Sequence, residues 1–430
     1  MVLKKFLRFL DLSPTAWHAA RQITDSLAEA DFTPLFESEC WDLEPGKSYF
    51  VLRDESVVCA FRMPKEEWKS SSLLATHLDS PALKLKPLPE LLQDRSTRLM
   101  TEVYGSPLLH TWLDRDLCLS GRAIVKQKNG EIESHLVHLD DYPLSIPSLP
   151  LHLDRSSADK GLIVNRQDHL QPIAALQTPY KVASLISKVL SFSELLSWDL
   201  FLVPLEKARF TGAAGELISS YRLDNLSSAF AALYGLLETS SCKNSLQLAI
   251  FWDHEEIGSK SALGAESFFV NQVLDRIRLS QKKTREELYC INSRSSSLSI
   301  DAAHGFNPNF PERFDPRNTP YLGDGVVLKM SALQKYATSA SSSARLIALA
   351  NKNGWNLQKY ASRSDIQGGS TVGPAMAANT GIMTCDIGIA AWAMHSIREQ
   401  VAASDEAALC QLSKAFLQEE ELFAFSNRPF

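Results

Sequence analysis

The stretch Leu246-Gln247-Leu248-Ala249-Ile250-Phe251-Trp252-Asp253-His254-Glu255-Glu256 decides the fold and points to the chemistry. Its first seven residues are mostly apolar, which predicts a buried strand. Two adjacent carboxylates end the stretch, and adjacent residues of an extended chain point in opposite directions. Glu255 and Glu256 are therefore poorly placed to do the same job. The economical division is one metal ligand and one general base, which is what metal-assisted hydrolysis requires.

Composition and charge exclude several classes of protein. The 430 residues can bury a large core and predict two domains, and 45% hydrophobic with 22% charged residues is ordinary for a soluble globular chain. The formal charge of −6 argues against a nucleic-acid binder, which would carry a basic face. The seven cysteines are scattered and never in C-x-x-C spacing, which favours a reducing cytoplasm over disulfides or a thiolate zinc site.

Two stretches bear on membrane association. The uncharged segment from Ile366 to Cys385 is long enough for a span, but it contains Pro374 and many Gly, Ser, Thr and Asn residues, which predicts loops and turns. Arg8 and Asp11 interrupt the apolar N-terminus, which favours an ordinary surface helix over a targeting segment. We therefore expect no membrane partner.

Apolar runs alternate with helical patterns in the first eighty residues and again from about residue 205. Strand-like runs precede His77, Asp253 and Asp301. Helical spacing is found in two sets, the second after a cap at Ser267: Leu226, Phe230, Leu233 and Leu237, then Phe269, Val273 and Ile277. This alternation predicts an α/β fold with a largely parallel, helix-covered sheet.

The middle of the chain, residues 85–205, has a different pattern. Strand-like runs flank Asn129-Gly130, which is a type I′ hairpin signal, and several prolines follow. We interpret this segment as a β-rich domain inserted into the α/β domain, which would comprise residues 1–84 and 206–430.

Four further sites carry residue types that could bind metal. Asp79 shares a strand face with His77 and could orient its ring. Asp224, ahead of a predicted helix, is either a helix cap or a carboxylate that bridges two metals. Asp301 follows a strand-like run, where ligands of α/β sheets gather, unless it only ends a turn. His395 is either a second imidazole ligand or a core histidine. Each signal alone is weak.

Together these sites amount to two histidines, three carboxylates and a spare glutamate at the ends of predicted elements. Such nitrogen and oxygen donors are the ligands of hydrolytic zinc. Five ligands are too many for one catalytic zinc and suit two ions about 3.5–4 Å apart that share a carboxylate. The motifs H-E-x-x-H, G-x-S-x-G, Walker A and G-x-G-x-x-G are absent, which removes the usual zincin, serine-hydrolase and nucleotide-binding alternatives.

Eight motifs follow one another in an order that we recognise: Thr76–Pro81, Thr111–Leu117, Arg222–Leu226, Asp253–Ser259, Asp301–His304, Gly369–Pro374, Asp386–Ile389 and Met394–Glu399. On these motifs the chain resembles the aspartyl aminopeptidases, a family of cytosolic di-zinc metallopeptidases, nearly from end to end. The resemblance implies a helix-covered mixed sheet of the di-zinc exopeptidase type.

The resemblance also implies a role for each site residue. Asp224 would bridge two Zn²⁺ per subunit, for which Mn²⁺ or Co²⁺ could substitute. His77 and Asp301 would complete one metal site, and Glu256 and His395 the other. The remaining roles are these: Glu255 as general base, Asp79 as the partner of His77, and His152, Glu255, Asp301, His304, Lys329 and Tyr336 as substrate contacts.

By the same resemblance, residues 85–205 would form a dimerisation domain, and dimers would assemble further into a tetrahedral dodecamer. His152 would reach the active site of a neighbouring subunit, and a core or turn histidine is the alternative that the sequence leaves open. Lys329 would supply the positive charge that an acidic substrate residue needs, since lysine is a compact point charge.

The expected function is removal of an N-terminal Asp or Glu from peptides by a zinc-activated bridging water. A di-zinc aminopeptidase or deacylase of different specificity is one alternative, and a non-catalytic peptide-binding assembly is another.

Overall fold

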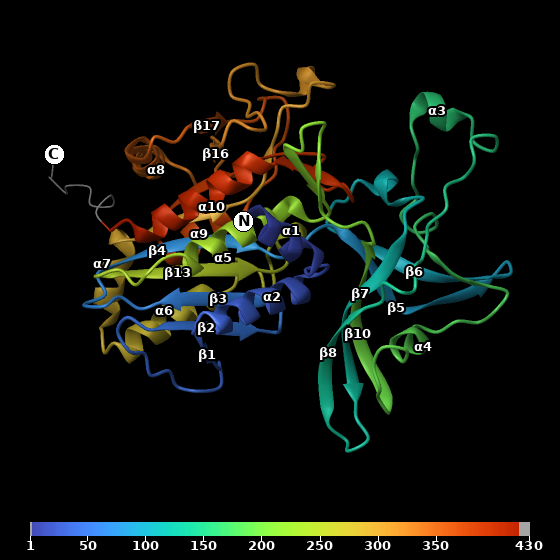
Figure 1. Cartoon of the computed structure of the whole chain (residues 1–430), viewed down its shortest axis with the longest axis horizontal. Coiled ribbons are helices and arrows are strands. Elements are labelled where there is room, and N and C mark those ends of the chain that lie inside the picture. Colours follow the sequence, from blue (N-terminus) through green and yellow to red (C-terminus); the bar gives the residue numbers. More distant parts are fainter. Residues whose placement is uncertain (1, 421–430) are drawn as a thin grey trace.

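Strand β13 (Ser245–Trp252) is buried along its whole length inside a nine-stranded sheet. The structure is a computed structural model that describes residues 2–420 (Figure 1). The order of this sheet is β1 (Thr33–Leu35), β2 (Ser48–Arg53), β3 (Val57–Arg62), β13, β4 (Ser70–His77), β14 (Ser296–Ile300), β18 (Met383–Gly388), β16 (Val326–Lys329) and β17 (Leu357–Tyr360).

The centre of the sheet is parallel and its flanks are mixed. Strands β13, β4, β14 and β18 run parallel to one another. Strands β3 and β16 pair with this centre antiparallel, so the sheet is mixed, as the resemblance implied, and less parallel than the alternation alone predicted. Because parallel strands end at one edge, the residues after β4, β13 and β14 meet there.

Helices cover both faces, and alternate residues of β13 supply the two cores between the layers. Phe251 packs into one core and Trp252 into the other. The first core is covered by α1 (Val2–Asp11), α2 (Ala16–Glu29), α5 (Leu223–Leu237), α8 (Ala340–Asn353) and α10 (Ala403–Gln418). The second is covered by α6 (Phe269–Ser280), α7 (Arg285–Arg294) and α9 (Val372–Thr380). The helical spacings around Phe230 and Val273 therefore mark real helices.

A six-stranded antiparallel sheet with its own core stands beside the nine-stranded one (Figure 1). Its order is β8 (Ile132–His138), β7 (Leu117–Lys126), β10 (Glu194–Pro204), β5 (Ala82–Gln93), β6 (Ser96–Tyr104) and β9 (Ile173–Leu176), with α3 (Ser156–Lys160), α4 (Val182–Ile186) and the 3-10 turn η1 (Leu109–Trp112) nearby in sequence. These strands fall in the β-rich segment around residues 85–205, whose status as a separate domain stays a prediction.

A small third sheet lies next to the edge where the central strands end. Its order is β11 (Arg209–Thr211), β12 (Leu217–Ser220), β20 (Glu399–Ala402), β19 (Ala390–Trp392) and β15 (Ala303–His304). Two further 3-10 turns are η2 (Glu255–Ile257) and η3 (Pro311–Arg313). The loop between β19 and β20 carries His395.

Two of three local expectations need correction. The hairpin at Asn129-Gly130 exists, but only Gly130 has a positive φ, of +90°, so the turn is not type I′. The segment from Ile366 to Cys385 is not all loop, because α9 tolerates Pro374 in its first turn, where a missing N–H costs little. The N-terminal helix is a surface helix, as expected, which buries Phe6 and Phe9 on one face and exposes Lys4 and Arg8 on the other.

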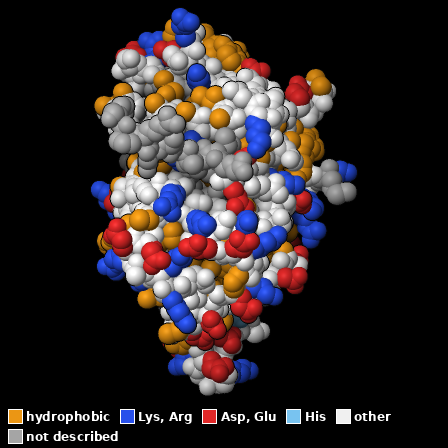
Figure 2. Space-filling model, turned by 90° about the vertical axis from the view of Figure 1, so that its left-hand side faces the viewer, with side chains coloured by type: hydrophobic (Ala, Val, Ile, Leu, Met, Phe, Trp, Pro, Cys, Tyr) orange, Lys and Arg blue, Asp and Glu red, His pale blue; other side chains and the backbone are white. Residues whose placement is uncertain are grey.

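Surface charge, helix length and the state of the cysteines bear on which partners and surroundings the chain could have. Figure 2 shows basic and acidic side chains interspersed on one face. Within residues 2–420, no helix is both long and apolar enough to cross a membrane. All seven cysteines are free thiols, five of them buried.

Candidate active site

Five separate segments bring their polar side chains to one cleft of about 400 Å³. His77 ends β4, and Asp301 directly follows β14. Glu255 and Glu256 begin the turn η2 that follows β13. The first turn of α5 and the loop after β19 supply the last two predicted ligands, Asp224 and His395. The cleft thus collects all five predicted metal ligands and the predicted general base.

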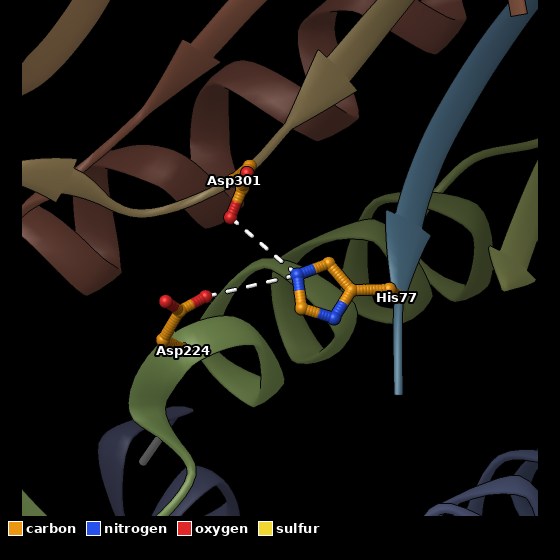
Figure 3. A group of neighbouring side chains, drawn as sticks. All are labelled: His77, Asp224 and Asp301. Carbon is orange, nitrogen blue, oxygen red and sulfur yellow. Dashed lines mark ion pairs between the residues drawn. The ribbon is translucent and has the colours of Figure 1, made fainter. Parts of the chain in front are cut away.

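Asp224 belongs to two groups of potential ligands at once. Its Oδ1 lies 3.7 Å from Nε2 of His77, and the same nitrogen lies 3.6 Å from Oδ1 of Asp301 (Figure 3). Its Oδ2 lies 3.5 Å from Nε2 of His395, which is 3.4 Å from Oε2 of Glu256. One carboxylate therefore faces two histidines, each with its own acidic companion.

The chain around Asp224 is shaped to present this carboxylate inward. Arg222 has a left-handed backbone at the start of α5, and the φ and ψ of Asp224 and Asn225 are not helical. The side-chain amide of Asn225 donates to Oγ1 of Thr76 and to the carbonyl of Ile300, both at 2.9 Å. The start of α5 is thereby tied to the ends of β4 and β14, next to His77 and Asp301. Arg222 occupies the cap position of α5 and no side chain caps this end, so the helix-cap interpretation of Asp224 is wrong.

Gly388 allows the segment of Asp301 to lie close to β18. A Cβ added at Gly388 would stand 1.8 Å from the carbonyl oxygen of Asp301. The main-chain N–H of Asp301 donates to the carbonyl of Ile387 at 2.9 Å. Any larger residue at position 388 would push the Asp301 carboxylate out of place.

Asp79 joins His77 to the two glutamates. Its Oδ1 and its main-chain oxygen lie 3.3 Å and 3.1 Å from Nδ1 of His77. The main-chain N–H groups of Glu255 and Glu256 donate to its carboxylate at 3.1 Å and 3.0 Å. A proton on Nδ1 that is held by Asp79 leaves Nε2 of His77 free to bind a metal.

His395 has an equivalent support. Its Nδ1 lies 3.0 Å from the carbonyl oxygen of Ser106, in the loop after β6. A proton on Nδ1 would be donated to this oxygen, which leaves Nε2 directed at Asp224 and Glu256. Both histidines therefore present the nitrogen that a metal needs.

Burial, together with crowded negative charge, raises the pKa values of both glutamates in the cleft. Burial, reinforced by the charge of Asp224, raises the pKa of Glu256 well above its usual range. Burial and the charges of Asp301 and Asp79 outweigh the attraction of His77 and raise the pKa of Glu255 to about 8. A cation in the cleft would relieve this repulsion.

The donor set and its spacing fit zinc. Zinc binds imidazole and carboxylate at about 2.0–2.1 Å, which places the ligand atoms of a tetrahedral shell about 3.4 Å apart. The nitrogen–oxygen distances in the two groups are 3.4 to 3.7 Å. In addition, Oδ1 of Asp224 and Oε1 of Glu256 are buried without a hydrogen bond. Such oxygens are costly unless a cation binds them.

Three predicted substrate residues, His304, Lys329 and Tyr336, line the same cleft. Burial, followed by the charge of Lys329, lowers the pKa of His304. Nζ of Lys329 lies 5.1 Å from the ring centre of Tyr336. It also donates to the main-chain oxygens of Asp301 and Ala302 at 2.9 Å and 3.1 Å. This lysine therefore supports the segment of Asp301 as well as lining the cleft.

His152 does not line this cleft. It lies in an exposed turn between β8 and α3, closed by a bond of 2.9 Å from the N–H of Leu153 to the carbonyl of Pro150. His152 is therefore not a core histidine, and its reach into a neighbouring active site stays a prediction.

Two further residues support the site, and sequence reasoning gave neither of them a role. Tyr104 donates a hydrogen bond to Asp79, and Glu399 accepts the N–H groups of Asp224 and His395. Tyr104 lies in an ordinary strand pattern that carries no signal. Glu399 ends one of the quoted motifs, four residues after His395, and that spacing was its only sign.

The fold and this donor cluster are those of a metal-dependent hydrolase. A family model described as "Aminopeptidase I zinc metalloprotease (M18)" matches residues 9–417. The chain therefore belongs to the M18 family of zinc aminopeptidases.

Two relatives illustrate the similarity. "Probable M18 family aminopeptidase 2" of Clostridium novyi is 36% identical, with 93% of this chain and 95% of the relative covered. "Aspartyl aminopeptidase 1" of Schizosaccharomyces pombe is also 36% identical, with 96% and 94% covered.

Solved structures agree in fold. A chain in the "Cryo-EM structure of the Ape4 and Nbr1 complex" superposes with a TM-score of 0.92 at 34% identity, covering 97% of this chain and 85% of that one. The "Structure of S. cerevesiae mApe1 dodecamer" superposes with a TM-score of 0.83 at 26% identity, covering 96% and 95%.

Proposed function

We propose that this M18 aminopeptidase removes an N-terminal Asp or Glu from peptides with the help of two zinc ions. The observation that carries the proposal is the placement of Asp224, whose two oxygens face His77 and His395 separately. One shared carboxylate between two complete groups is the arrangement that a metal pair requires. His77 and Asp301 would hold one ion, Glu256 and His395 the other.

The chain's own residues would handle the proton. When bound, a zinc pair polarises the scissile carbonyl and lowers the pKa of water. The carboxylate of Glu255 accepts the proton of the attacking water and passes it to the leaving amine. Its main-chain N–H is fixed by Asp79, and its Oε2 lies 4.0 Å from Nε2 of His77, so it stands beside the metal-binding groups. Asp301 is a candidate acceptor for the α-amino group of the substrate.

The acidic preference rests on Lys329 and on the printed name of the fission-yeast relative. Lysine has three donors, and two of them point to main-chain oxygens here. One donor remains for a substrate carboxylate, which would share the positive charge with Asp301, whose Oδ2 lies 3.8 Å from Nζ. The second candidate is an M18 aminopeptidase without acidic preference. It is favoured by the same two hydrogen bonds, because they show that Lys329 also supports the main chain at Asp301 and Ala302.

We also propose that residues 85–205 form a dimerisation domain and that the dimers assemble into a dodecamer, the assembly by which the S. cerevisiae structure is described. This segment exposes several apolar side chains near His152 in sequence: Leu149, Leu151, Leu153 and Ile163. Such side chains gain from burial against another subunit. A cytoplasmic location would suit the seven free thiols.

The proposal is tested by assaying purified protein on a panel of Asp-, Glu-, Leu- and Ala-aminoacyl substrates, with and without a chelator, while zinc content is measured in parallel. We expect two zinc ions per chain, hydrolysis that the chelator abolishes, and faster turnover of Asp and Glu. Faster turnover of Leu or Ala would favour the second candidate. Zinc binding without hydrolysis would indicate a peptide-binding assembly instead.

A further inference from the structure

Glu399, at the start of β20, holds two predicted ligands through one carboxylate. Its Oε2 accepts the main-chain N–H of Asp224 at 2.8 Å, and its Oε1 accepts that of His395 at 2.7 Å. The side chain is buried, with 2% of its surface exposed. The two N–H groups come from separate segments, the start of α5 and the loop between β19 and β20.

Both of these N–H groups belong to backbone that needs to be held. His395 has a φ of +67°, in the left-handed region that residues with a Cβ disfavour. Asp224 has non-helical φ and ψ within the first turn of α5, so its N–H cannot rely on regular helix geometry. A buried carboxyl group that offers one acceptor oxygen to each N–H satisfies both groups, which would be costly to leave unpaired.

The other predicted ligands are held without Glu399. The N–H groups of Glu255 and Glu256 donate to Asp79, and that of Asp301 donates to Ile387. His77 ends a regular strand. Among the predicted ligands, Glu399 therefore holds only the main chain of Asp224, whose carboxylate is shared, and that of His395.

We propose that Glu399 is a positioning residue of the aminopeptidase, which sets the distance between Asp224 and His395 so that both can bind one metal ion. The inference rests on the proposed zinc ligands. It implies an asymmetry, because the site of Glu256 and His395 loses two held ligands when Glu399 fails, whereas the site of His77 and Asp301 loses only Asp224.

The test is the Glu399→Gln variant, titrated with zinc against a chromophoric chelator. Glutamine offers one acceptor oxygen and a donor amide, so one of the two N–H groups would face a donor. Loss of a partner that orients a ligand weakens metal binding about 10- to 100-fold. We expect such a loss for one zinc ion and a clearly smaller one for the other.

A matched control separates positioning from charge and from burial. Glu406 in α10 is completely buried, and its Oε2 makes no hydrogen bond, but it contacts no predicted ligand. Glu406→Gln should leave both zinc affinities unchanged. Equal weakening of both ions by Glu399→Gln would indicate a charge effect and overturn the proposal, as would unchanged binding.

Hydrogen exchange on the metal-free wild-type chain provides a readout that needs no variant. Peptides that cover Asp224 and His395 should exchange slowly without zinc, because Glu399 holds both N–H groups. Exchange at the rate of exposed loops would overturn the proposal even if the variant did not fold. If the wild type binds fewer than two zinc ions, the two-metal function fails, and the exchange data still decide the role of Glu399.

Discussion

The hydroxyl of Tyr104 donates a hydrogen bond of 2.7 Å to Oδ2 of Asp79. Tyr104 is the last residue of β6 in the six-stranded sheet, and Asp79 follows β4 of the nine-stranded sheet. The ring of Tyr104 packs edge-on against Phe201 of β10, with centres 5.4 Å apart. The second sheet therefore contacts directly the carboxylate that orients His77.

Removal of this hydroxyl tests the connection. Tyr104→Phe keeps the ring packing on Phe201 but leaves Oδ2 of Asp79 with one donor fewer. We expect zinc affinity and kcat/KM to fall about 10-fold, since a partner of a metal-binding histidine is loosened. Tyr221→Phe is the control, because Tyr221 donates to the carbonyl of Pro81 and not to Asp79. Equal effects of both variants would argue against a specific role for Tyr104.

The general base is tested by Glu255→Gln. We expect turnover to fall about 10²- to 10⁴-fold, because an amide cannot accept the proton. Zinc content should stay near that of the wild type, since Glu255 is not among the five proposed ligands. Glu266→Gln, at an exposed position, should change neither quantity. A Glu255→Gln variant with wild-type turnover would remove this residue from the mechanism.

Lys329→Met separates two tasks of one lysine. If Lys329 recognises acidic substrates, hydrolysis of Asp and Glu should fall at least about 10-fold more than hydrolysis of Leu, since a charge-assisted contact is lost. If it only supports Asp301 and Ala302, all substrates should suffer alike, together with zinc affinity. The ratio of kcat/KM values for Asp and Leu substrates distinguishes these results.

The proposed reach of His152 into a neighbour is tested by mixing inactive subunits. We expect His152→Ala and Glu255→Gln each to be nearly inactive alone. In a mixed dimer, the subunit with an intact Glu255 would receive His152 from its partner, so co-expression should restore part of the activity. No recovery in verified mixed dimers would place His152 outside the neighbouring site.

Acid sensitivity is predicted at His18, far from the proposed ligands in sequence. Burial, with repulsion from His138 and Arg222, lowers the pKa of His18 from 6.5 to about 3. As the pH falls, His18 is protonated in the unfolded chain before it is protonated in the folded one. Its contribution to the free energy of unfolding is therefore fully present above pH 6.5 and is lost as the pH drops towards 3. In the presence of chelator, His18→Gln should lose less in Tm between pH 7.5 and 5 than the wild type, whereas the exposed His110→Gln should behave like the wild type.

Strands followed by acidic or histidine residues were the most predictable part of this chain. The apolar runs before His77, Asp253 and Asp301 predicted neighbouring strand ends, because parallel strands place their carboxyl ends at one edge. The ligand pattern needed the family resemblance as well, since Asp224 and His395 each had an equally good structural explanation in sequence.

Residues that act through long-range contacts were not predictable. Tyr104 and Glu399 are ordinary strand residues until the fold brings them to Asp79, Asp224 and His395. The antiparallel flanks of the large sheet and the turn at Gly130 also depend on tertiary pairing, which local patterns do not encode. The two hydrogen bonds of Lys329 to Asp301 and Ala302 were not predictable either, because their acceptors are main-chain oxygens, which every residue carries.

The proposed ligands lie in segments spread from His77 to His395. Neither proposed metal site, that of His77 and Asp301 or that of Glu256 and His395, is complete within a short piece of chain. A ribosome-bound chain that has not yet reached His395 would lack one group altogether. Catalytic competence would then appear only late in synthesis, after the loop of His395 has left the ribosome. Because the ligands are spread along the sequence, activity would have to wait until the chain has been synthesised as far as His395.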